Sequence, residues 1–303
     1  MNLKRLFVVI ALTLFSIQGS ASHLLGGEII WRCKPNGKYQ FTLVLYRDCG
    51  GITLGTSAET IANSAGVAIS ASYVSTTDVV PACYTGTTTC AGATSGTGKM
   101  QKYLYRSGDI TLTGVPPVGG WNFTWNSCCR PGSISNTSTG GYLLRAVMYP
   151  YTPPGATGPL SAGTSAIPTC FDSSPNFLED PQVISCTNVD VVYNNLGYDP
   201  DLDSLYYNWA APLAGTSWPG TAVAWNTGYT TMSPMPSGTG STGVTIDGTT
   251  GEVNFKSALA GSWATCVKIE EWRCGQKIGE IFRDIPIVTL GCPAGTGLCA
   301  SAF

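Results

Sequence analysis

The sequence predicts an all-β protein built from two disulfide-stapled, β-sandwich-like domains. Apolar and polar residues alternate with a period of two in many short segments, as in strands with one buried face, and helical periodicity is almost absent. The 37 glycines and 19 prolines interrupt these segments repeatedly, which is typical of turns between short strands. The 12 cysteines are an even number and favour a framework of disulfide bonds.

The first domain is expected over residues 23–150. Its clearest strands are residues 28–33 and 39–47, joined through Pro35-Asn36-Gly37-Lys38, because Asn-Gly readily adopts the positive φ angles of a tight hairpin turn. The other strands of this domain are expected at residues 67–74, 102–105, 109–112, 121–126 and 142–149.

The second domain is expected over residues 169–292, after a segment, 151–168, that is rich in Pro, Gly, Thr, Ser and Ala. This segment is interpreted as a linker, or as a long loop inside one domain. A series of short strands separated by turns is typical of an immunoglobulin-like or cadherin-like sandwich. These strands are expected at residues 182–186, 189–193, 205–209, 244–246, 252–255, 263–271 and 277–290, and a small-residue tail follows at 293–303.

Residues 1–22 have the features of a signal peptide for the Sec export pathway. Lys4 and Arg5 precede an unbroken apolar run over residues 6–15, and small residues follow at 19–22. The run is too short to span a bilayer, and no later stretch is long and apolar enough to form a transmembrane segment. The mature protein is therefore expected to be extracellular or on the cell surface, in an oxidising environment where cysteines pair.

The charge content limits the classes of function. Charged residues make up only 11% of the chain and the formal net charge is -2, which argues against nucleic acid as a partner. The chain has a single histidine, His23, and no nucleophile-elbow motif, so a serine-histidine triad is not favoured. A glycosidase-like pair of carboxylates stays open, since any two acidic residues could converge. The composition as a whole predicts a protein that is not an enzyme.

Several short motifs follow one another along the chain. They are residues 21–33 (ASHLLGGEIIWRC), 46–49 (YRDC), 125–130 (WNSCCR), 173–177 (SSPNF), 199–205 (DPDLDSL), 223–229 (VAWNTGY), 270–273 (EEWR) and 283–284 (RD). In this order they resemble the large gliding-type secreted surface proteins of Bacteroidota. The resemblance implies a surface-exposed, adhesin-like protein whose DPDLDSL motif belongs to a cadherin-like or immunoglobulin-like domain.

Three aspartates of the DPDLDSL motif are the candidate metal ligands. In an extended segment the carboxylates of Asp199, Asp201 and Asp203 point to one side and repel one another unless a cation lies between them. Calcium is the candidate cofactor, because it takes six to eight oxygen ligands. Leu202 stands where similar motifs have a glycine, and the alternative is a simple Asx-rich turn. Further ligands are sought among Asn194, Asn195, Asp190, Glu179 and Asp180.

Aromatic residues suggest a second kind of site. Trp121, Phe123 and Trp125 share one face of an expected strand, with amide and hydroxyl side chains on the other face, as in platforms that stack on sugar rings. Trp225, near Trp218 and Tyr229, is a second candidate for glycan binding. The alternative for each is a place in the hydrophobic core of a sandwich.

The cysteines predict a partial disulfide map. Cys33 and Cys49 are expected to bond Cys128 and Cys129 in some order, because vicinal cysteines on a strand point to opposite faces. Cys83 and Cys90 are expected to close a local loop. Cys186 and Cys266 are expected to link two strands of the second domain, in the manner of an immunoglobulin sandwich. Partners of the remaining cysteines stay open: Cys170, Cys274, Cys292 and Cys299.

Together these features predict a non-enzymatic secreted structural or adhesin-like protein of the cell surface, self-associating into an extracellular fibre. Its low charge, β-rich pattern and disulfides suit a protease-resistant chain whose strand edges, or whose tail at 293–303, contact a neighbouring copy. The alternative is a monomeric protein that binds surface glycans through the aromatic platforms.

Overall fold

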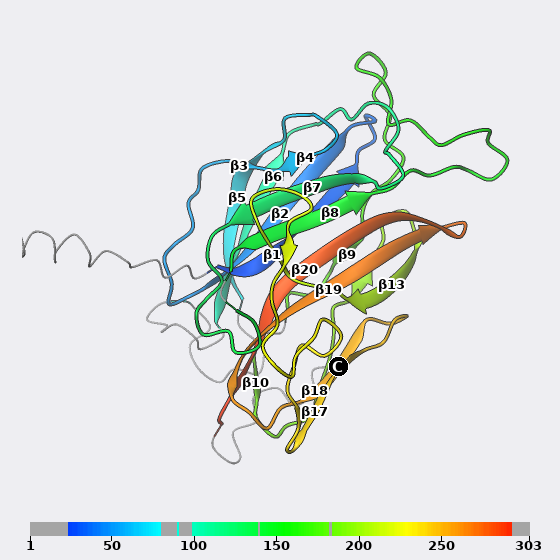
Figure 1. Cartoon of the computed structure of the whole chain (residues 1–303). Coiled ribbons are helices and arrows are strands. Elements are labelled where there is room, and N and C mark those ends of the chain that lie inside the picture. Colours follow the sequence, from blue (N-terminus) through cyan, green and yellow to red (C-terminus); the bar gives the residue numbers. More distant parts are fainter. Residues whose placement is uncertain (1–23, 80–89, 91–98, 139, 182–183, 293–303) are drawn as a thin grey trace, which may run out of the picture.

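The computed structural model of this chain describes residues 24–79, 90, 99–138, 140–181 and 184–292. Its regular secondary structure consists of β-strands (Figure 1). The described residues contain no helix, so the all-β prediction is confirmed. In particular, no helix of this part of the chain is long and apolar enough to cross a membrane. The predicted signal peptide, His23 and the tail at 293–303 lie outside the described residues.

The largest sheet has twelve strands and contains the predicted hairpin in its interior. The two strands of the hairpin pair in register from Cys33 and Tyr39 onward, and the turn between them holds Gly37 at φ 78°, as the Asn-Gly signal predicted. The segment expected as a strand at 109–112 makes only an isolated bridge, between Ile110 and Tyr39. From the hairpin outward, this side contains β1 (Leu24–Cys33), β2 (Tyr39–Asp48), β6 (Met100–Ser107), β5 (Ser70–Val79) and β3 (Glu59–Thr60).

The longest strand, β20 (Gln276–Leu290), joins the two halves of the chain. It pairs with β1 and β8 from the first half, and with β10 and β19 from the second. The sheet therefore continues across the segment 151–168, where a domain boundary was expected. Around β20 the sheet contains β8 (Tyr142–Met148), β7 (Trp121–Ser127), β4 (Ala62–Asn63), β10 (Ile184–Cys186), β19 (Gly261–Arg273) and β13 (Ser204–Trp209).

The second half is sandwich-like. A four-stranded sheet packs against β13, β19 and β20 through a separate apolar cluster that includes Phe255, Trp263 and Ile287. Its immunoglobulin-like or cadherin-like topology stays a prediction. The strands of this sheet are β11 (Val191–Asn194), β18 (Glu252–Lys256), β17 (Ser241–Ile246) and β16 (Ser237–Gly238). Two short pairs complete the elements: β9 (Asn176–Phe177) with β12 (Gly197–Tyr198), and β14 (Leu213–Ala214) with β15 (Thr221–Ala222).

Two adjacent glycines allow β1 to lie against β20. Gly26 has φ +148°, and a Cβ at this position would lie 1.7 Å from the carbonyl oxygen of Asp284. A Cβ on Gly27 would lie 2.2 Å from the carbonyl oxygen of Val44 on the other neighbouring strand. Any side chain here would separate the strands, which explains why the motif around residue 26 contains Gly-Gly.

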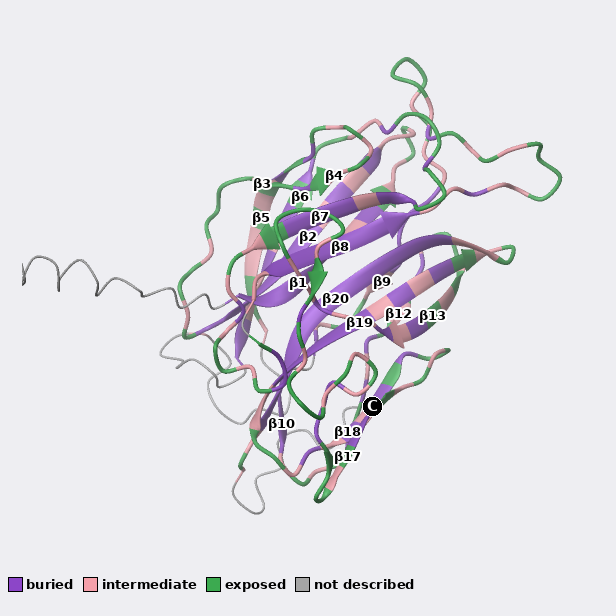
Figure 2. Cartoon of the chain, viewed as in Figure 1, coloured by how far each residue is buried: buried purple, intermediate pink, exposed green. Residues whose placement is uncertain are grey.

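The main core lies against the first half of the sheet, where most strand residues are buried (Figure 2). Trp121 and Trp125 belong to this core, with only 6% and 8% of their surface exposed. The indole nitrogen of Trp125 donates to Glu59 over 2.9 Å. Their interpretation as a glycan platform is therefore wrong, and the alternative of a core strand holds. The face of β7 that carries the aromatic side chains is the core face of the strand, packed within the main apolar cluster.

Three disulfides are described: Cys33–Cys170, Cys49–Cys90 and Cys186–Cys292. All three differ from the predicted pairs. Cys33 and Cys49 cannot reach the vicinal cysteines that follow β7, because β20 and β8 lie between β1 and β7. Cys186 does not reach Cys266, because β20 lies between their strands. The thiols without a disulfide among the described residues are Cys128, Cys129, Cys266 and Cys274, whereas Cys83 and Cys299 lie outside this part of the chain.

Replacing both Cys33 and Cys170 by serine is expected to lower the free energy of unfolding by about 2 to 4 kcal/mol. The bond closes a loop with a sequence separation of 137 residues, so its loss frees a long stretch of the unfolded chain. Urea denaturation of the double variant and of the unreduced protein measures the difference. Equal urea midpoints and equal slopes for the two proteins would show that the Cys33–Cys170 disulfide is absent or does not stabilise the fold.

Candidate metal centre

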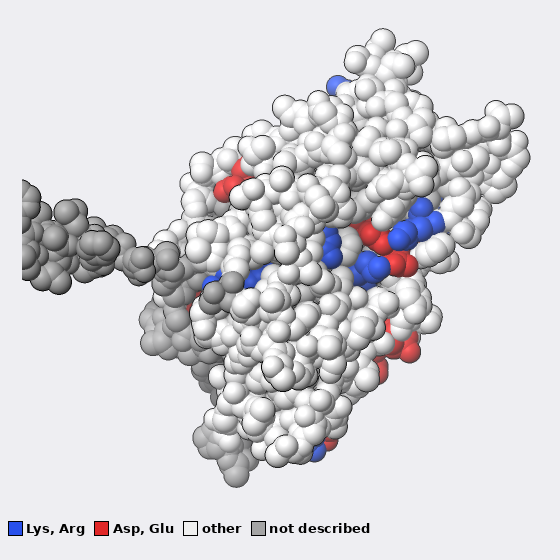
Figure 3. Space-filling model, in the orientation of Figure 1, with Lys and Arg blue, Asp and Glu red and all other residues white. Residues whose placement is uncertain are grey.

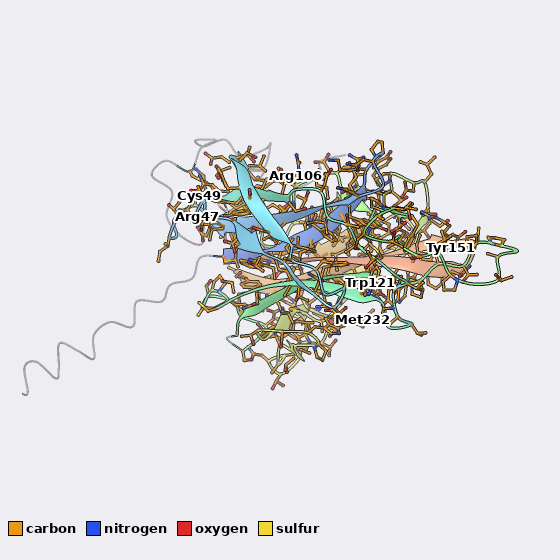
Figure 4. The ribbon with its side chains drawn as sticks, turned by 90° about the horizontal axis from the view of Figure 1, so that it is seen from above. Arg47, Cys49, Arg106, Trp121, Tyr151 and Met232 are labelled. Carbon is orange, nitrogen blue, oxygen red and sulfur yellow. A yellow bond between two sulfur atoms is a disulfide. The ribbon has the colours of Figure 1, made fainter. Side chains whose placement is uncertain are left out.

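Five acidic side chains from three separate segments gather into what we call the acidic cluster: Asp172, Asp199, Asp201, Asp203 and Glu271. The cluster lies near the start of β20, where Arg273 packs over the Tyr151 ring at 5.3 Å. Tyr151 marks this end of the molecule in Figure 4, opposite the end that holds Arg47 and Cys49. On the face shown in Figure 3, acidic and basic side chains also gather in a band across the middle, between two largely uncharged regions.

The turn between β12 and β13 positions the three aspartates of the DPDLDSL motif. One carboxylate oxygen of Asp199 accepts hydrogen bonds from the backbone N–H groups of Asp201 (2.8 Å) and Asp203 (3.0 Å). These are the bonds of an Asx-type turn, so the simpler alternative describes the backbone correctly. Leu202 adopts φ +64°, the conformation that a glycine would take without strain, and its side chain is 83% exposed. The missing glycine is therefore accommodated, with the apolar side chain turned to solvent.

A second segment brings Asp172 to this turn. Its course is fixed by the Cys33–Cys170 disulfide and by Ser174, whose hydroxyl accepts from the N–H of Trp31 at 2.9 Å. The N–H of Ser173 in turn donates to the carboxylate of Asp201 over 2.6 Å. The SSPNF motif thus runs beside the end of β1 and holds Asp172, which is fully buried, against the aspartate turn.

The third segment is β19, which contributes Glu271. This residue is fully buried, and neither of its carboxylate oxygens has a hydrogen-bond partner. Gly279 faces it on β20, where a Cβ would lie 2.3 Å from one of these oxygens. One oxygen each of Asp172 and Asp199 also lacks a partner. Buried carboxylate oxygens without donors are rare because their desolvation is costly, so four at one place need a physical explanation.

Arg273 neutralises only part of this charge. Its guanidinium donates to both oxygens of Asp203, with Nε at 2.8 and 3.0 Å, and to one oxygen of Asp172 at 2.9 Å. A third nitrogen donates to the carbonyl of Phe171. Glu271 receives none of these bonds. One guanidinium thus faces five carboxylates, and the inner side of the cluster, lined by Glu271 and Asp199, is left without a positive partner.

The uncompensated burial changes the protonation of the cluster. Burial, and after it the neighbouring Asp172, raises the pKa of Glu271 far above its ordinary value. Burial raises the pKa of Asp172 to about 7 and also raises the pKa of Asp199. These shifts favour the protonated forms of Glu271 and Asp172 when no cation is bound. A bound cation would replace these protons.

The donor set fits calcium. Asp199, Asp203 and Glu271 each offer one carboxylate oxygen, and these oxygens lie within 4.8 Å of one another, as do those of Asp172, Asp201 and Asp203. A hard cation with metal–oxygen distances of about 2.3–2.6 Å can contact oxygens at this separation. All the candidate ligands are carboxylates, which suit calcium better than zinc.

Sequence reasoning identified three of the five residues. It missed Asp172 and Glu271, although both lie in or beside the quoted motifs SSPNF and EEWR. The other expected ligands have different roles in the described structure. Asn194 bonds the backbone of Thr250 and Leu196, Asp190 pairs with Lys256, and Asp180 pairs with Lys102. Asn195 and the carbonyl of Glu179 both accept from Arg283.

Other motifs meet at a second place, in the middle of the sheet. Glu28 of the first motif accepts from Arg283 at 2.5 and 2.9 Å, and Arg130 of the WNSCCR motif donates to Asp284 at 2.8 Å. All four residues are at most 4% exposed. We call them the central ion pairs. They join β1 and the segment after β7 to β20, and thus connect the two halves of the chain.

Trp225, the remaining predicted glycan residue, is half-buried, and its indole nitrogen donates to Thr231 over 3.3 Å. It does not lie beside Trp121 or Trp125 in the main core, so the three tryptophans do not form one surface.

Comparison of the chain with protein-family models, with curated proteins and with solved structures found no match.

Proposed function

We propose that this chain is a non-enzymatic, extracellular adhesive or structural module whose fold is completed by a bound calcium ion. The observation that carries the proposal is Glu271, which is fully buried with two unpartnered oxygens facing other acidic side chains. A divalent cation between Asp199, Asp203 and Glu271 would supply a partner for the oxygens of Glu271 and Asp199 and reduce the repulsion among these carboxylates.

The three segments of the cluster suggest what such an ion does. Asp172 lies on the segment tied to β1, Asp199 and Asp203 lie on the turn before β13, and Glu271 lies in β19. Together they would hold the ion between parts of the chain that are distant in sequence. Calcium supplies charge neutralisation and links these segments, and the protein side chains position the oxygens. The role is structural, because the unpartnered oxygens are buried rather than open to a substrate.

An extracellular location is consistent with this role. The described disulfides require an oxidising environment, and the segment at 1–22 has the features of a signal peptide. Calcium is abundant outside cells, so a site of modest affinity would be filled there. The resemblance of the short motifs to those of gliding-type surface proteins of Bacteroidota supports an adhesin-like role on a cell surface.

We propose that copies of this chain associate into an extracellular fibre. Negative-stain electron microscopy of the mature protein from its native surface, with calcium kept in every buffer, tests it. Regular filaments are expected, and they should shorten or disappear after truncation of residues 293–303. Uniform single particles would contradict assembly and favour the second candidate function, a monomeric glycan-binding module.

A further inference from the structure

We propose that the outer face of β13 and β19 carries a glycan-binding site centred on Tyr206 and Trp272. These two side chains line a pocket of about 430 Å³ together with Ser204, Leu205 and Glu270. This volume lies in the range of small-molecule sites. Neither aromatic residue belongs to the surfaces that the sequence suggested for glycans.

Strand register places the two rings next to each other. β13 and β19 are antiparallel, with Ser204 opposite Trp272 and Tyr206 opposite Glu270. Tyr206 and Trp272 are therefore diagonal neighbours on one face, at a spacing that long aromatic side chains can bridge. They are 48% and 37% exposed, although both are large and partly apolar. In a chain whose other strand aromatics are mostly buried, this pair is open to solvent.

The rings are held in place by their neighbours. The indole nitrogen of Trp272 donates to one oxygen of Glu270 at 3.3 Å, while Lys268 donates to the other oxygen at 2.5 Å. The Tyr206 ring packs on Gly248, where a Cβ would lie 2.6 Å from a ring carbon. Because strands and hydrogen bonds fix these side chains before a ligand arrives, little freedom is lost on binding.

The chemistry of the pocket fits a neutral sugar. A pyranose ring has an apolar C–H face that can stack on Trp272 or Tyr206, and hydroxyl groups at its edge that need partners. Glu270 is an acceptor beside the stacking surface. Lys268 lies between Glu270 and Glu280 (3.5 Å), so its charge is balanced and an anionic ligand is not favoured.

A peptide strand is a poorer fit at this place. Strand addition needs a free edge of backbone donors and acceptors. The N–H of Tyr207 already donates to the carbonyl of Gly248 at 2.8 Å, so the turn around residue 248 covers the middle of the β13 edge. Recognition must therefore use the side chains on the outer face, where rings and a carboxylate lie.

The inference rests on the proposed adhesive function and names a ligand class for it. The pocket is nevertheless separate from the acidic cluster. Glu271 points inward from β19, whereas its neighbours Glu270 and Trp272 point outward. Loss of sugar binding and loss of calcium binding can therefore be measured independently.

The test uses the full mature chain in calcium and a panel of soluble oligosaccharides of glucose, xylose, mannose and N-acetylglucosamine. Titration calorimetry measures binding to each. We expect at least one of them to bind, and Trp272→Ala or Tyr206→Ala to weaken that binding by about tenfold or more. Val118→Ala is the control, since Val118 is 92% exposed and is not among the residues that line the pocket.

Thermal unfolding and calcium titration of each variant check that the fold is intact. If Trp272→Ala does not fold, Ser204→Tyr fills the pocket from β13 and serves as the second variant. Absence of binding by every oligosaccharide would overturn the inference, as would binding that survives Trp272→Ala. Concentration-dependent dimerisation that Trp272→Ala abolishes would also overturn it, in favour of a contact between copies of the chain.

Discussion

Glu28→Ala is expected to lower the free energy of unfolding by about 3 to 5 kcal/mol. The substitution leaves Arg283 buried, with 1% of its surface exposed, and without its carboxylate partner. Its remaining hydrogen-bond acceptors are the carbonyl of Glu179 at 2.8 Å and the amide oxygen of Asn195 at 3.5 Å. The charge cannot be relieved by deprotonation, because a guanidinium stays protonated at all accessible pH values.

Urea denaturation measures this loss, and Asp109→Ala is the control. Asp109 also pairs with a basic residue, Lys34, but on the surface, where the pair is screened by water. Its replacement is expected to leave the midpoint almost unchanged. If Glu28→Ala were as mild as this control, the central ion pairs would not hold β1 to β20, and the way in which the two halves of the chain are joined would need another explanation.

Chelation of calcium is expected to lower the free energy of unfolding by about 2 to 3 kcal/mol when the ion had been present at about 100 times its dissociation constant. For a chain of this size the melting temperature should fall by about 4–5 °C. The reason is the acidic cluster. Without the ion, Glu271 and Asp172 must take up protons or repel each other, and the link between three segments is lost. Differential scanning calorimetry with calcium and with chelator gives the shift.

Two variants on one strand separate the site from its surroundings. Glu271→Gln keeps the shape but removes an inward carboxylate, so the calcium-dependent shift should disappear. The chelated form should be about as stable as the chelated native protein, because a neutral amide replaces a carboxyl group that already holds a proton when no ion is bound. Glu270→Gln changes the next residue, which points outward, and should keep the full shift. A calcium shift that survives Glu271→Gln would contradict the assignment of this residue.

Alternation of side chains allowed most strands to be predicted from the sequence. The strands near residues 28–33, 121–126 and 263–271 were confirmed with small changes of their ends, because each has one strongly buried face. The partners of β20 could not be predicted in the same way. It is buried over most of its length and pairs with strands from both halves, and a pattern along one strand contains no information about such distant neighbours.

The same limit explains the disulfides. The predicted pairs rested on the opposite faces of the vicinal cysteines and on the pattern of an immunoglobulin sandwich, and neither contains the order of strands in the sheet. In the structure β20 separates β10 from β19, and Cys186 therefore reaches Cys292, just beyond the end of β20. Cys266, its predicted partner, stays a buried thiol whose pKa is raised by burial to about 12. Local spacing could not show this order of strands.

Only those residues of the candidate site that are close together in the sequence could be predicted. Asp199, Asp201 and Asp203 lie in one short motif, and their turn could be inferred from residue type. Asp172 and Glu271 join them through long-range contacts. The aromatic prediction failed for a related reason, since alternation places Trp121 and Trp125 on one face of a strand but does not show whether another layer covers it.

Calorimetric titration of calcium into the chelated protein decides whether the acidic cluster binds the ion. The titration is repeated in two buffers that differ in their heat of protonation. Saturable binding is expected, with release of protons as the ion displaces them from Glu271 and Asp172, and the binding should be lost in Glu271→Gln. Absence of binding heat in both buffers, or equal binding by Glu271→Gln, would contradict a calcium site in the acidic cluster.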